Sequence, residues 1–482
     1  MKHQHMITTT PTLSAVQIKE IFELQKSKAP EVKLSSVKER VAKLRRLLVY
    51  MLDHRTDLEQ AVYNDFQKPF QETALTEIYT VSKDIKHTIR HLKGWLKPKK
   101  VSTPLAMLGS SSKVYFEPKG VALILAPWNY PFYLTIGPLI YAIAAGNCAM
   151  VKPSELTPHT SLFIEKMLRN LFPKDEVCVI QGGIDVSTEL LKLKFDHIYF
   201  TGSPQVGKIV MEAAAKHLTS VTLELGGKSP VIVDDSADLE DTAAKVMWGK
   251  MVNAGQTCIA PDYLMVSENK LNELLPKLKE AIKILQDPEG RGVKQSTSFA
   301  RIINEKHFYR LRNLIDDAVD KGANVVYGGE VDLETKYIAP TILTNVTPDM
   351  QVMKEEIFGP VLPIMTYTET EEALSFVAEG EKPLAFYLFC RNRTLTELII
   401  KNTTAGSTCI NDCLVQLANP NLPFGGVNNS GIGKGNGYYG FLEFVNQRSV
   451  LKQRVGFTGI KLFYPPYTEQ KGKMLDMLIK WL

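Results

Sequence analysis

The stretch VALILA, at residues 121–126, decides the fold class of this chain. It is apolar throughout and is followed by Pro127, which is typical of a strand buried on both faces. Helical segments and further short apolar strands then alternate. These strands are predicted at 148–151, 177–180, 197–200, 221–225 and 231–233. Short apolar strands separated by helices indicate a parallel sheet with helices on both faces.

A second region of the same kind follows along the chain. Its strands are predicted near 263–266, 361–366 and 385–389, and its helices near 269–285 and 304–321. The first 95 or so residues have the apolar spacing of helices, and a Lys-, Pro- and Ser-rich connector leads from them to a strand at 113–117. The sequence therefore predicts an α/β protein with two lobes and a shared connector.

The composition excludes several classes of protein. A hydrophobic content of 44 % and a charged content of 23 % are close to globular averages, and a net charge of +5 over 482 residues is too diffuse for a nucleic-acid binder. Six cysteines without a CxxC pair predict neither a disulfide scaffold nor a metal site. The chain starts without an apolar leader, and glycine and proline interrupt its longest apolar stretch, 132–151. We expect a cytoplasmic protein without a transmembrane span.

The segment GSPQVGK, residues 202–208, is the best candidate for an anion-binding loop. It follows a strand and opens a helix, so its backbone N–H groups favour a phosphate, although a plain turn remains the alternative. Ile209 replaces the Ser or Thr of an ATP-binding P-loop. The GxGxxG match at 435–440 follows no predicted strand, and we do not interpret it as a dinucleotide site.

A Lys and a Glu follow the strand predicted at 148–151. In a nucleotide-binding lobe the end of the second strand lies beside the adenosine ribose, so Lys152 and Glu155 can bind its hydroxyl groups. The Lys152 ammonium could also meet a 2′-phosphate. An ordinary surface lysine at a strand end is the alternative.

Three side chains suit nucleophilic catalysis. Cys258 ends NAGQTC, where a turn can direct backbone N–H groups at a thiolate. Glu224, like Glu356 in EEIFGP, is an acid among apolar residues, where desolvation raises the pKa toward that of a general base. Asn129 lies between two prolines and offers a rigid amide to an oxyanion. An inert cysteine, a solvated glutamate and a turn-forming asparagine are the alternatives.

Together and in this order, these motifs resemble the aldehyde dehydrogenase superfamily. The resemblance covers most of the chain, and the short length, PWNYP and the residues after Cys258 resemble its class 3 and fatty-aldehyde branch. The run KGNGYYGF after Gly433 departs from that branch. The matching segments are APWNYP (126–131), VKPSE (151–155), FTGSPQVG (200–207), LELGGKSP (223–230), AGQTCIAPDY (254–263), EEIFGP (355–360) and PFGGVNNSGIG (423–433).

The resemblance implies two Rossmann-like open-sheet lobes and a small β bridging arm. The expected division is 1–97 with 119–225 for NAD(P) binding, 226–420 for catalysis, 98–118 with 434–451 for the bridging and oligomerisation arm, and 452–482 for a C-terminal tail. It also implies a homodimer. We expect a helix in the tail that packs on the body, on a partner subunit or on a membrane surface.

The resemblance further implies oxidation of a medium-chain, long-chain or aromatic aldehyde with NAD or NADP. Cys258 would attack the aldehyde, Asn129 would hold the oxyanion, and Glu224, with Glu356 as the alternative base, would activate the hydrolytic water. Tyr130 and Asn411 are expected on the substrate side. The expected cofactor contacts are Trp128, Lys152, Glu155, Thr201, Gly202, Ser203, Val206, Gly207, Leu225, Gly226, Glu356 and Phe358.

Two alternative functions stay open at this point. In a CoA-acylating dehydrogenase, CoA rather than water would take the acyl group, and the hydrolytic base Glu224 argues against this reaction. A non-catalytic protein that kept the fold is the other alternative, and the intact Cys258, Glu224 and Asn129 argue against it.

Overall fold

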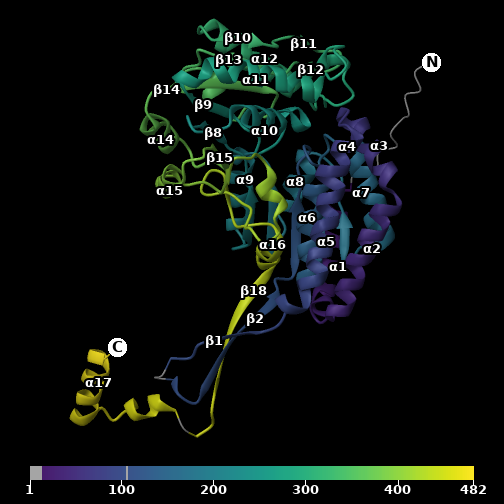
Figure 1. The fold of residues 1–482 in the computed structure, drawn as a ribbon. Helices are drawn as coiled ribbons and strands as arrows, with labels where there is room; N and C mark the ends of the chain where they lie inside the picture. Colours follow the sequence, from purple (N-terminus) through teal and green to yellow (C-terminus); the bar gives the residue numbers. More distant parts are fainter. Residues whose placement is uncertain (1–12, 105–106, 457, 482) are drawn as a thin grey trace.

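The chain forms two α/β units, a long β arm and a C-terminal helix beyond the arm (Figure 1). This computed structural model describes residues 13–104, 107–456 and 458–481. The predicted α/β class with two open-sheet lobes is confirmed.

The first unit contains a six-stranded sheet with the order β17-β7-β6-β3-β4-β5. All neighbours are parallel except β17, which runs antiparallel to β7. The chain moves outward from β3 to β5 and then crosses back to β6, so the strand order reverses between β3 and β6. A crevice at such a reversal is where open α/β sheets bind nucleotides. The strands are β3 (Val121–Leu125), β4 (Cys148–Lys152), β5 (Val177–Val179), β6 (His197–Thr201), β7 (Ser220–Glu224) and β17 (Gly431–Ile432).

Helices cover both faces of this sheet because its central strands are apolar on both sides. Ile124 of β3 packs into one buried cluster with α2, α5 and α6, whereas Leu123 packs into a second cluster with α1 and α9. The helices are α1 (Ala15–Lys33), α2 (Val37–Asp53), α3 (Arg55–Phe66), α4 (Phe70–Thr73), α5 (Thr80–Trp95), α6 (Tyr133–Ala145), α7 (Pro158–Leu171), α8 (Ile184–Leu191) and α9 (Pro204–Ala215); a π-helix, Ala74–Tyr79, joins α4 to α5.

The second unit contains a seven-stranded sheet with the order β10-β13-β14-β9-β8-β15-β16. Only the edge strand β10 pairs antiparallel. The strands are β8 (Pro230–Val233), β9 (Tyr263–Ser267), β10 (Asn324–Tyr327), β13 (Thr341–Thr344), β14 (Val361–Tyr367), β15 (Ala385–Phe389) and β16 (Ser407–Ile410), with a hairpin of β11 (Val331–Asp332) and β12 (Tyr337–Ile338). The helices are α10 (Leu239–Met251), α11 (Glu268–Gln286), α12 (Glu305–Asp320), α13 (Gln351–Lys354), α14 (Thr370–Glu379) and α15 (Arg393–Asn402).

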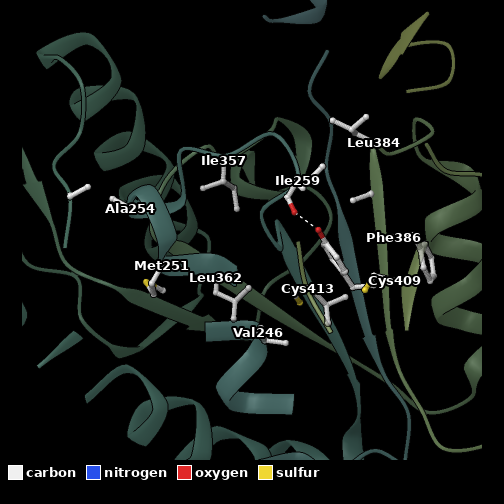
Figure 2. Close-up of a cluster of buried hydrophobic side chains, with 14 of the residues drawn as sticks. Val246, Met251, Ala254, Ile259, Ile357, Leu362, Leu384, Phe386, Cys409 and Cys413 are labelled. Carbon is white, nitrogen blue, oxygen red and sulfur yellow. Dashed lines mark hydrogen bonds between the residues drawn. The ribbon is translucent and has the colours of Figure 1, made fainter. Parts of the chain in front are cut away.

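The core of the second unit holds the loop that carries Cys258. Figure 2 shows Val246 and Met251 of α10 beside Leu362 of β14. In the same view, a tyrosine hydroxyl donates to the carbonyl of Ile259; this is Tyr387 of β15, at 2.6 Å. The residue after Cys258 is therefore tied to a buried strand.

Three antiparallel strands form the arm, β1 (Lys99–Val101), β2 (Ser110–Pro118) and β18 (Val445–Gln453). We expected the second arm segment at 434–451. In the structure, residues Gly437–Glu443 form α16, whose Phe441 ring packs 5.5 Å from that of Trp95 on the body. The arm strand therefore begins only at Val445, because α16 before it holds the buried Phe441 against Trp95 of α5.

The tail ends in α17 (Glu469–Trp481), which Figure 1 shows beyond the arm. From Glu469 to Lys480 its side chains are exposed, except for the half-buried Lys471. The expected helix is present, but it does not pack on the body in the part of the chain that the structure describes. Over the same residues, no helix has both the length and the apolar content needed to cross a bilayer.

Candidate active site

A cavity lies where the two units meet. Cys258 and Glu224, which are far apart in sequence, both line it. The remaining wall residues come from helices of the first unit, from strand ends and from the glycine-rich loop near residue 435. They are Asp84, Tyr133, Leu134, Gly137, Pro138, Tyr141, Tyr199, Thr201, Leu225, Leu384, Phe424, Gly435 and Asn436.

A strained turn presents Cys258 to this cavity. Asn253 and Ala254 have φ values of 56° and 50°, which are unusual for residues other than glycine. At Gly255 (φ 74°) a Cβ atom would lie 2.2 Å from the carbonyl oxygen of Gly359. Such a backbone persists only where its surroundings hold it, and strain of this kind clusters at functional sites.

The Cys258 thiol is protonated at neutral pH in this environment. Burial raises its pKa well above the usual range, and the carboxyl groups of Glu356 and Glu224 raise it further. The backbone N–H groups of Cys258 and Ile259 oppose this shift but do not cancel it. The expected depression of the thiol pKa by the turn is therefore absent, and a base must accept the thiol proton.

Glu224 can act as such a base. It is the last residue of β7 and is 6 % exposed. Its Oε1 accepts hydrogen bonds from the Tyr199 hydroxyl and the Gly435 N–H, both at 3.2 Å, whereas Oε2 has no hydrogen-bond partner among the described residues. Burial raises the pKa of Glu224 to about 8, against these two hydrogen bonds.

The Asn129 amide lies directly behind the thiol loop. Its Nδ2 donates to the carbonyl of Gln256 at 3.1 Å, and its own carbonyl accepts from Asn253 Nδ2 at 2.9 Å. Two hydrogen bonds thus connect Asn129 to the loop that carries Cys258, and they hold the amide in a defined position relative to the thiol.

The charged residues that hold these two segments were not predicted from the sequence. Lys68 and Glu77 are fully buried and pair at 3.0 Å. Glu77 Oε2 accepts from the N–H groups of Phe132 and Tyr133, at 2.8 and 3.1 Å. Buried charges are retained only when they are paired. Lys68 lies in the loop between α3 and α4 and Glu77 lies in the π-helix, so no local pattern could have revealed the pair.

Tyr130 and a second buried acid complete this support. The Lys68 ammonium lies 3.9 Å from the ring centroid of Tyr130, and the Tyr130 hydroxyl lies 2.7 Å from Thr257 Oγ1. Glu72 accepts from the Asn253 N–H at 2.8 Å, and burial raises its pKa to about 7. Tyr130 therefore contacts the thiol loop, and it is not among the residues that line the cavity in the described structure.

The predicted phosphate loop has the form of an anion site. Thr201 ends β6, and Ser203 accepts from the N–H of Val206, which caps α9. A Cβ on Gly202 would lie 2.4 Å from the Phe200 ring, and one on Gly207 would lie 2.7 Å from Leu225 Cδ2. A side chain at either position would force the Phe200 ring or the Leu225 side chain to move.

Glu356 and its neighbours border the same crevice. A Cβ on Gly226 would lie 2.0 Å from Glu356 Oε2, so the carboxylate is seated on the glycine backbone. Oε1 is buried and makes no hydrogen bond to any described residue, and burial raises the pKa of Glu356 to about 8. The Phe358 and Trp128 rings pack edge to face at 5.4 Å. An orphaned carboxylate oxygen and a glycine floor fit a hydroxyl-bearing ligand such as a ribose.

The two residues expected at the adenosine ribose pair with each other. Lys152 is 5 % exposed, and its ammonium contacts Glu155 Oε2 at 2.8 Å and the Pro153 carbonyl at 3.2 Å. The Glu155 side chain is 43 % exposed. The ammonium thus already has a counter-charge.

Asn411 lies at the end of β16, away from the cavity lining of the described residues. Its Oδ1 accepts from the N–H of Cys390 at 2.8 Å, and its Nδ2 donates to the Cys390 carbonyl at 2.9 Å. Both ends of the amide therefore bind backbone. Within the described ranges, no group of three or more His, Cys, Asp or Glu side chains is placed to hold a metal ion.

Comparison with known proteins gives a consistent match. The aldehyde dehydrogenase family model matches residues 2–450. A 4,4′-diaponeurosporen-aldehyde dehydrogenase of Staphylococcus aureus is 43 % identical, over 90 % of this chain and 92 % of its own. Aldehyde dehydrogenase family 3 member A2 of Mus musculus is also 43 % identical, over 90 % of this chain and 88 % of its own.

A solved structure agrees over nearly the whole fold. The substrate-bound state of Staphylococcus aureus AldH superposes with a TM-score of 0.91 at 40 % identity. The match covers 96 % of this chain and 99 % of that one.

Proposed function

Because the chain belongs to the aldehyde dehydrogenase family, it oxidises aldehydes with a nicotinamide cofactor, and we propose that Cys258 is the nucleophile of this oxidation. The observation that carries the proposal is that Cys258 and Glu224, with its unpaired Oε2, face one cavity in the described structure. An aldehyde has no alkoxide from which a hydride can leave, and addition of the thiol creates one.

The first steps use the thiol loop and the segment behind it. Glu224 or Glu356 accepts the thiol proton, and Cys258 Sγ attacks the carbonyl carbon to form a thiohemiacetal. The Cys258 N–H and the Asn129 amide stabilise the oxyanion, in an arrangement that the Asn253 and Gln256 contacts already fix. The nicotinamide ring, when bound, supplies the hydride acceptor.

The later steps return the thiol. Loss of hydride leaves a thioester on Cys258. Glu224 then takes a proton from water, which attacks the thioester carbon, and the carboxylic acid departs as the thiol is restored. We assign this role to Glu224 rather than Glu356 because Glu224 lines the same cavity as Cys258, whereas Glu356 is seated on Gly226.

The residues of the crevice fit the cofactor. The loop Gly202–Gly207, with Thr201, Ser203 and Val206, would hold the pyrophosphate at the beginning of α9. Glu356 would bind the nicotinamide ribose, with Trp128, Leu225, Gly226 and Phe358 around it. Lys152 and Glu155 would bind the adenosine ribose. We propose that NAD is preferred to NADP, because Glu155 already neutralises Lys152 and would repel a 2′-phosphate.

We further propose medium-chain, long-chain or aromatic aldehydes as substrates, a cytoplasmic location and a homodimer joined through the arm. All six cysteines are free, which fits a reducing compartment. β18 has an edge that pairs with no described strand, which suits association with a second copy. The exposed α17 suits peripheral contact with a membrane.

An assay of NADH formation with hexanal and benzaldehyde tests the function. The wild-type chain should reduce NAD, and Cys258→Ala should abolish turnover; a wild-type rate in Cys258→Ala would contradict the assignment. Addition of CoA distinguishes the acylating reaction, since formation of acyl-CoA in place of the free acid would exclude hydrolysis as the main route.

A further inference from the structure

Three residues that line the cavity each have a buried side-chain oxygen that accepts no hydrogen bond from a described residue. These oxygens are Glu224 Oε2, Asp84 Oδ1 and Asn436 Oδ1. The proposed hydrolysis uses the first, but it gives no role to the other two. A buried acceptor without a donor is unfavourable by about 1–3 kcal/mol, so a cavity with two such acceptors fits a ligand that brings donors.

Asp84 is a carboxylate on the wall of this cavity. It lies on α5 and is 2 % exposed. The nearest ammonium, Lys83 Nζ, is 3.8 Å from Oδ1 and already donates to the Ala418 carbonyl at 2.6 Å. Burial raises the pKa of Asp84 to about 6, against Lys83 and the Tyr141 hydroxyl, so the carboxylate is mostly ionised at neutral pH.

Asn436 adds the second acceptor, and it belongs to the run KGNGYYGF that departs from the class 3 pattern. The orientation of its amide is set by its donors. Its Nδ2 contacts three carbonyl oxygens, of Leu417, Asn419 and Leu422, at 2.8–3.3 Å. The Oδ1 atom must therefore point the other way, and Asn436 is one of the cavity-lining residues.

The loop Gly435–Gly437 links this end of the cavity to the catalytic end. The Gly435 N–H donates to Glu224, and the Gly437 N–H donates to the Tyr141 hydroxyl at 2.9 Å. Because Tyr141 accepts from Gly437, its own hydrogen is directed at Asp84. Asp84 and Glu224 are thus connected through Tyr141 and this loop, and both residues line the same cavity.

We propose that Asp84 and Asn436 form a polar subsite that binds a hydrogen-bond donor at the far end of the aldehyde. The proposal rests on the proposed function, and it narrows the substrate class to aliphatic aldehydes with a terminal ammonium or hydroxyl group. The cavity lining also contains the aromatic and apolar residues Tyr133, Leu134 and Phe424, which suit the methylene chain of such a molecule.

The wild-type enzyme gives the first test, with four aldehydes of equal chain length. They are hexanal and its derivatives with a terminal hydroxyl, ammonium or trimethylammonium group. The ammonium derivative should have a kcat/KM about tenfold or more above that of hexanal, the gain expected of a charge-assisted hydrogen bond, and the hydroxyl derivative an intermediate value. Trimethylammonium has the charge but no N–H, so it should not show this gain.

Asp84→Asn gives the second test, read as the ratio of kcat/KM for the ammonium derivative to that for hexanal. The ratio should fall about tenfold, because the carboxylate charge is lost. Asp57→Asn, an exposed acid on α3, is the matched control and should keep the wild-type ratio. A thermal unfolding curve checks that Asp84→Asn is folded; if it is not, the wild-type comparison still decides.

The outcomes separate this proposal from the proposed function. If no aldehyde is oxidised, the proposed function fails. If hexanal is oxidised as well as the hydroxyl and ammonium derivatives, or if Asp84→Asn lowers all rates equally, the subsite is refuted while the function stands. A trimethylammonium derivative as good as the ammonium derivative would replace hydrogen bonding by aromatic recognition of the cation and would refute the donor assignment.

Discussion

Burial raises the pKa of both Glu224 and Glu356 to about 8, but different neighbouring groups oppose the shift at each residue. Burial is the main cause for both; Tyr199 and Gly435 oppose it at Glu224, and the Gly227 N–H opposes it at Glu356. A base with this pKa is effective near neutral pH. The pKa therefore does not distinguish the two carboxylates. Their positions do, because Glu224 lines the cavity with Cys258 and Glu356 is not among the lining residues of the described structure.

Glu224→Gln should slow hydrolysis of the thioester by about 10²-fold or more, which is the usual contribution of a general base. Acylation should be less affected, so the first turnover should give a burst of NADH in a stopped-flow trace. A uniformly slow trace without a burst would instead place Glu224 in acylation. Glu356→Gln is the matched control and should give no burst.

The pH dependence follows from the direction of the Glu224 shift. Its pKa is raised from 4.5 to about 8, so the carboxyl group is protonated below this pH and cannot accept a proton. The kcat of the wild-type enzyme should therefore fall as the pH falls through about 8. In Glu224→Gln this fall of kcat at low pH should disappear. If kcat of Glu224→Gln still fell with the pH, the titrating group would be another residue.

Glu155→Gln tests the preference for NAD. Loss of the carboxylate leaves the Lys152 ammonium without its partner at 2.8 Å, and it removes a negative charge that would face a 2′-phosphate. The ratio of kcat/KM for NADP to that for NAD should rise about tenfold. Glu165→Gln, an acid on the neighbouring α7, is the control. An unchanged ratio in Glu155→Gln would contradict the ribose assignment.

At the scale of elements, the π-helix Ala74–Tyr79 connects the N-terminal helices to the site. π-helical turns are rare in proteins, and those that occur are often found at functional sites. This one carries Glu77, whose carboxylate contacts Lys68 and the beginning of α6. The segments around Lys68, Glu77 and Asn129 are separate in sequence and come together only in the folded chain.

Glu77→Gln should lower kcat/KM about tenfold by loosening the segment that carries Asn129. The effect should vanish in an Asn129→Ala background, because the two residues would act through one contact. Kinetic assays of the double-mutant cycle give this coupling. If the role of Glu77 were merely structural, Glu77→Gln would lower kcat/KM by the same factor in the wild-type and in the Asn129→Ala background.

Stability gives the control for this cycle. Lys68 is fully buried, and removal of its counter-charge should cost about 3–5 kcal/mol in the free energy of unfolding, measured in urea. Glu31→Gln, which breaks the exposed pair with Lys28, should change the free energy of unfolding far less, because solvent screens that pair. A small cost for Glu77→Gln would mean that the buried pair is not the main support of the segment.

At the scale of the whole molecule, the arm and the tail leave the body (Figure 1). The tail 452–482 carries six basic residues and two acidic ones. In α17 the charged residues Lys473, Asp476 and Lys480 lie on one face, and the rest of the surface is largely apolar and exposed. A basic amphipathic helix of this kind suits the surface of an anionic membrane.

Deletion of residues 473–482 should abolish co-sedimentation with phosphatidylserine vesicles, because it removes most of the apolar face of α17. Ile479→Asp should have the same direction of effect, whereas Asp476→Asn on the polar face should not weaken binding. Size-exclusion chromatography of the same variants reports the dimer. The tail has no such role if deletion changes neither vesicle binding, dimerisation nor aldehyde range.

The alternation of apolar strands and helices predicted the two α/β units, and the order of the motifs predicted the family. Cys258 and Glu224 could be singled out because a cysteine in a glycine turn and an acid in an apolar strand are locally unusual. Asp84 and Lys68 could not, because in sequence they are an ordinary charged residue of a helix and one of a loop. Their burial depends on which helix face meets the rest of the protein.

The sequence by itself therefore determined the fold class and the family, and it singled out Cys258 as the proposed nucleophile, since these depend on local pattern and strand order. Only the tertiary structure decided which residues share the cavity. It turned Tyr130 toward Thr257, bound Asn411 to the backbone of Cys390, and placed Asp84 and Asn436 on the cavity wall. The physical reason is that side-chain direction and burial are set by packing between segments far apart in the chain, and no local pattern records that packing.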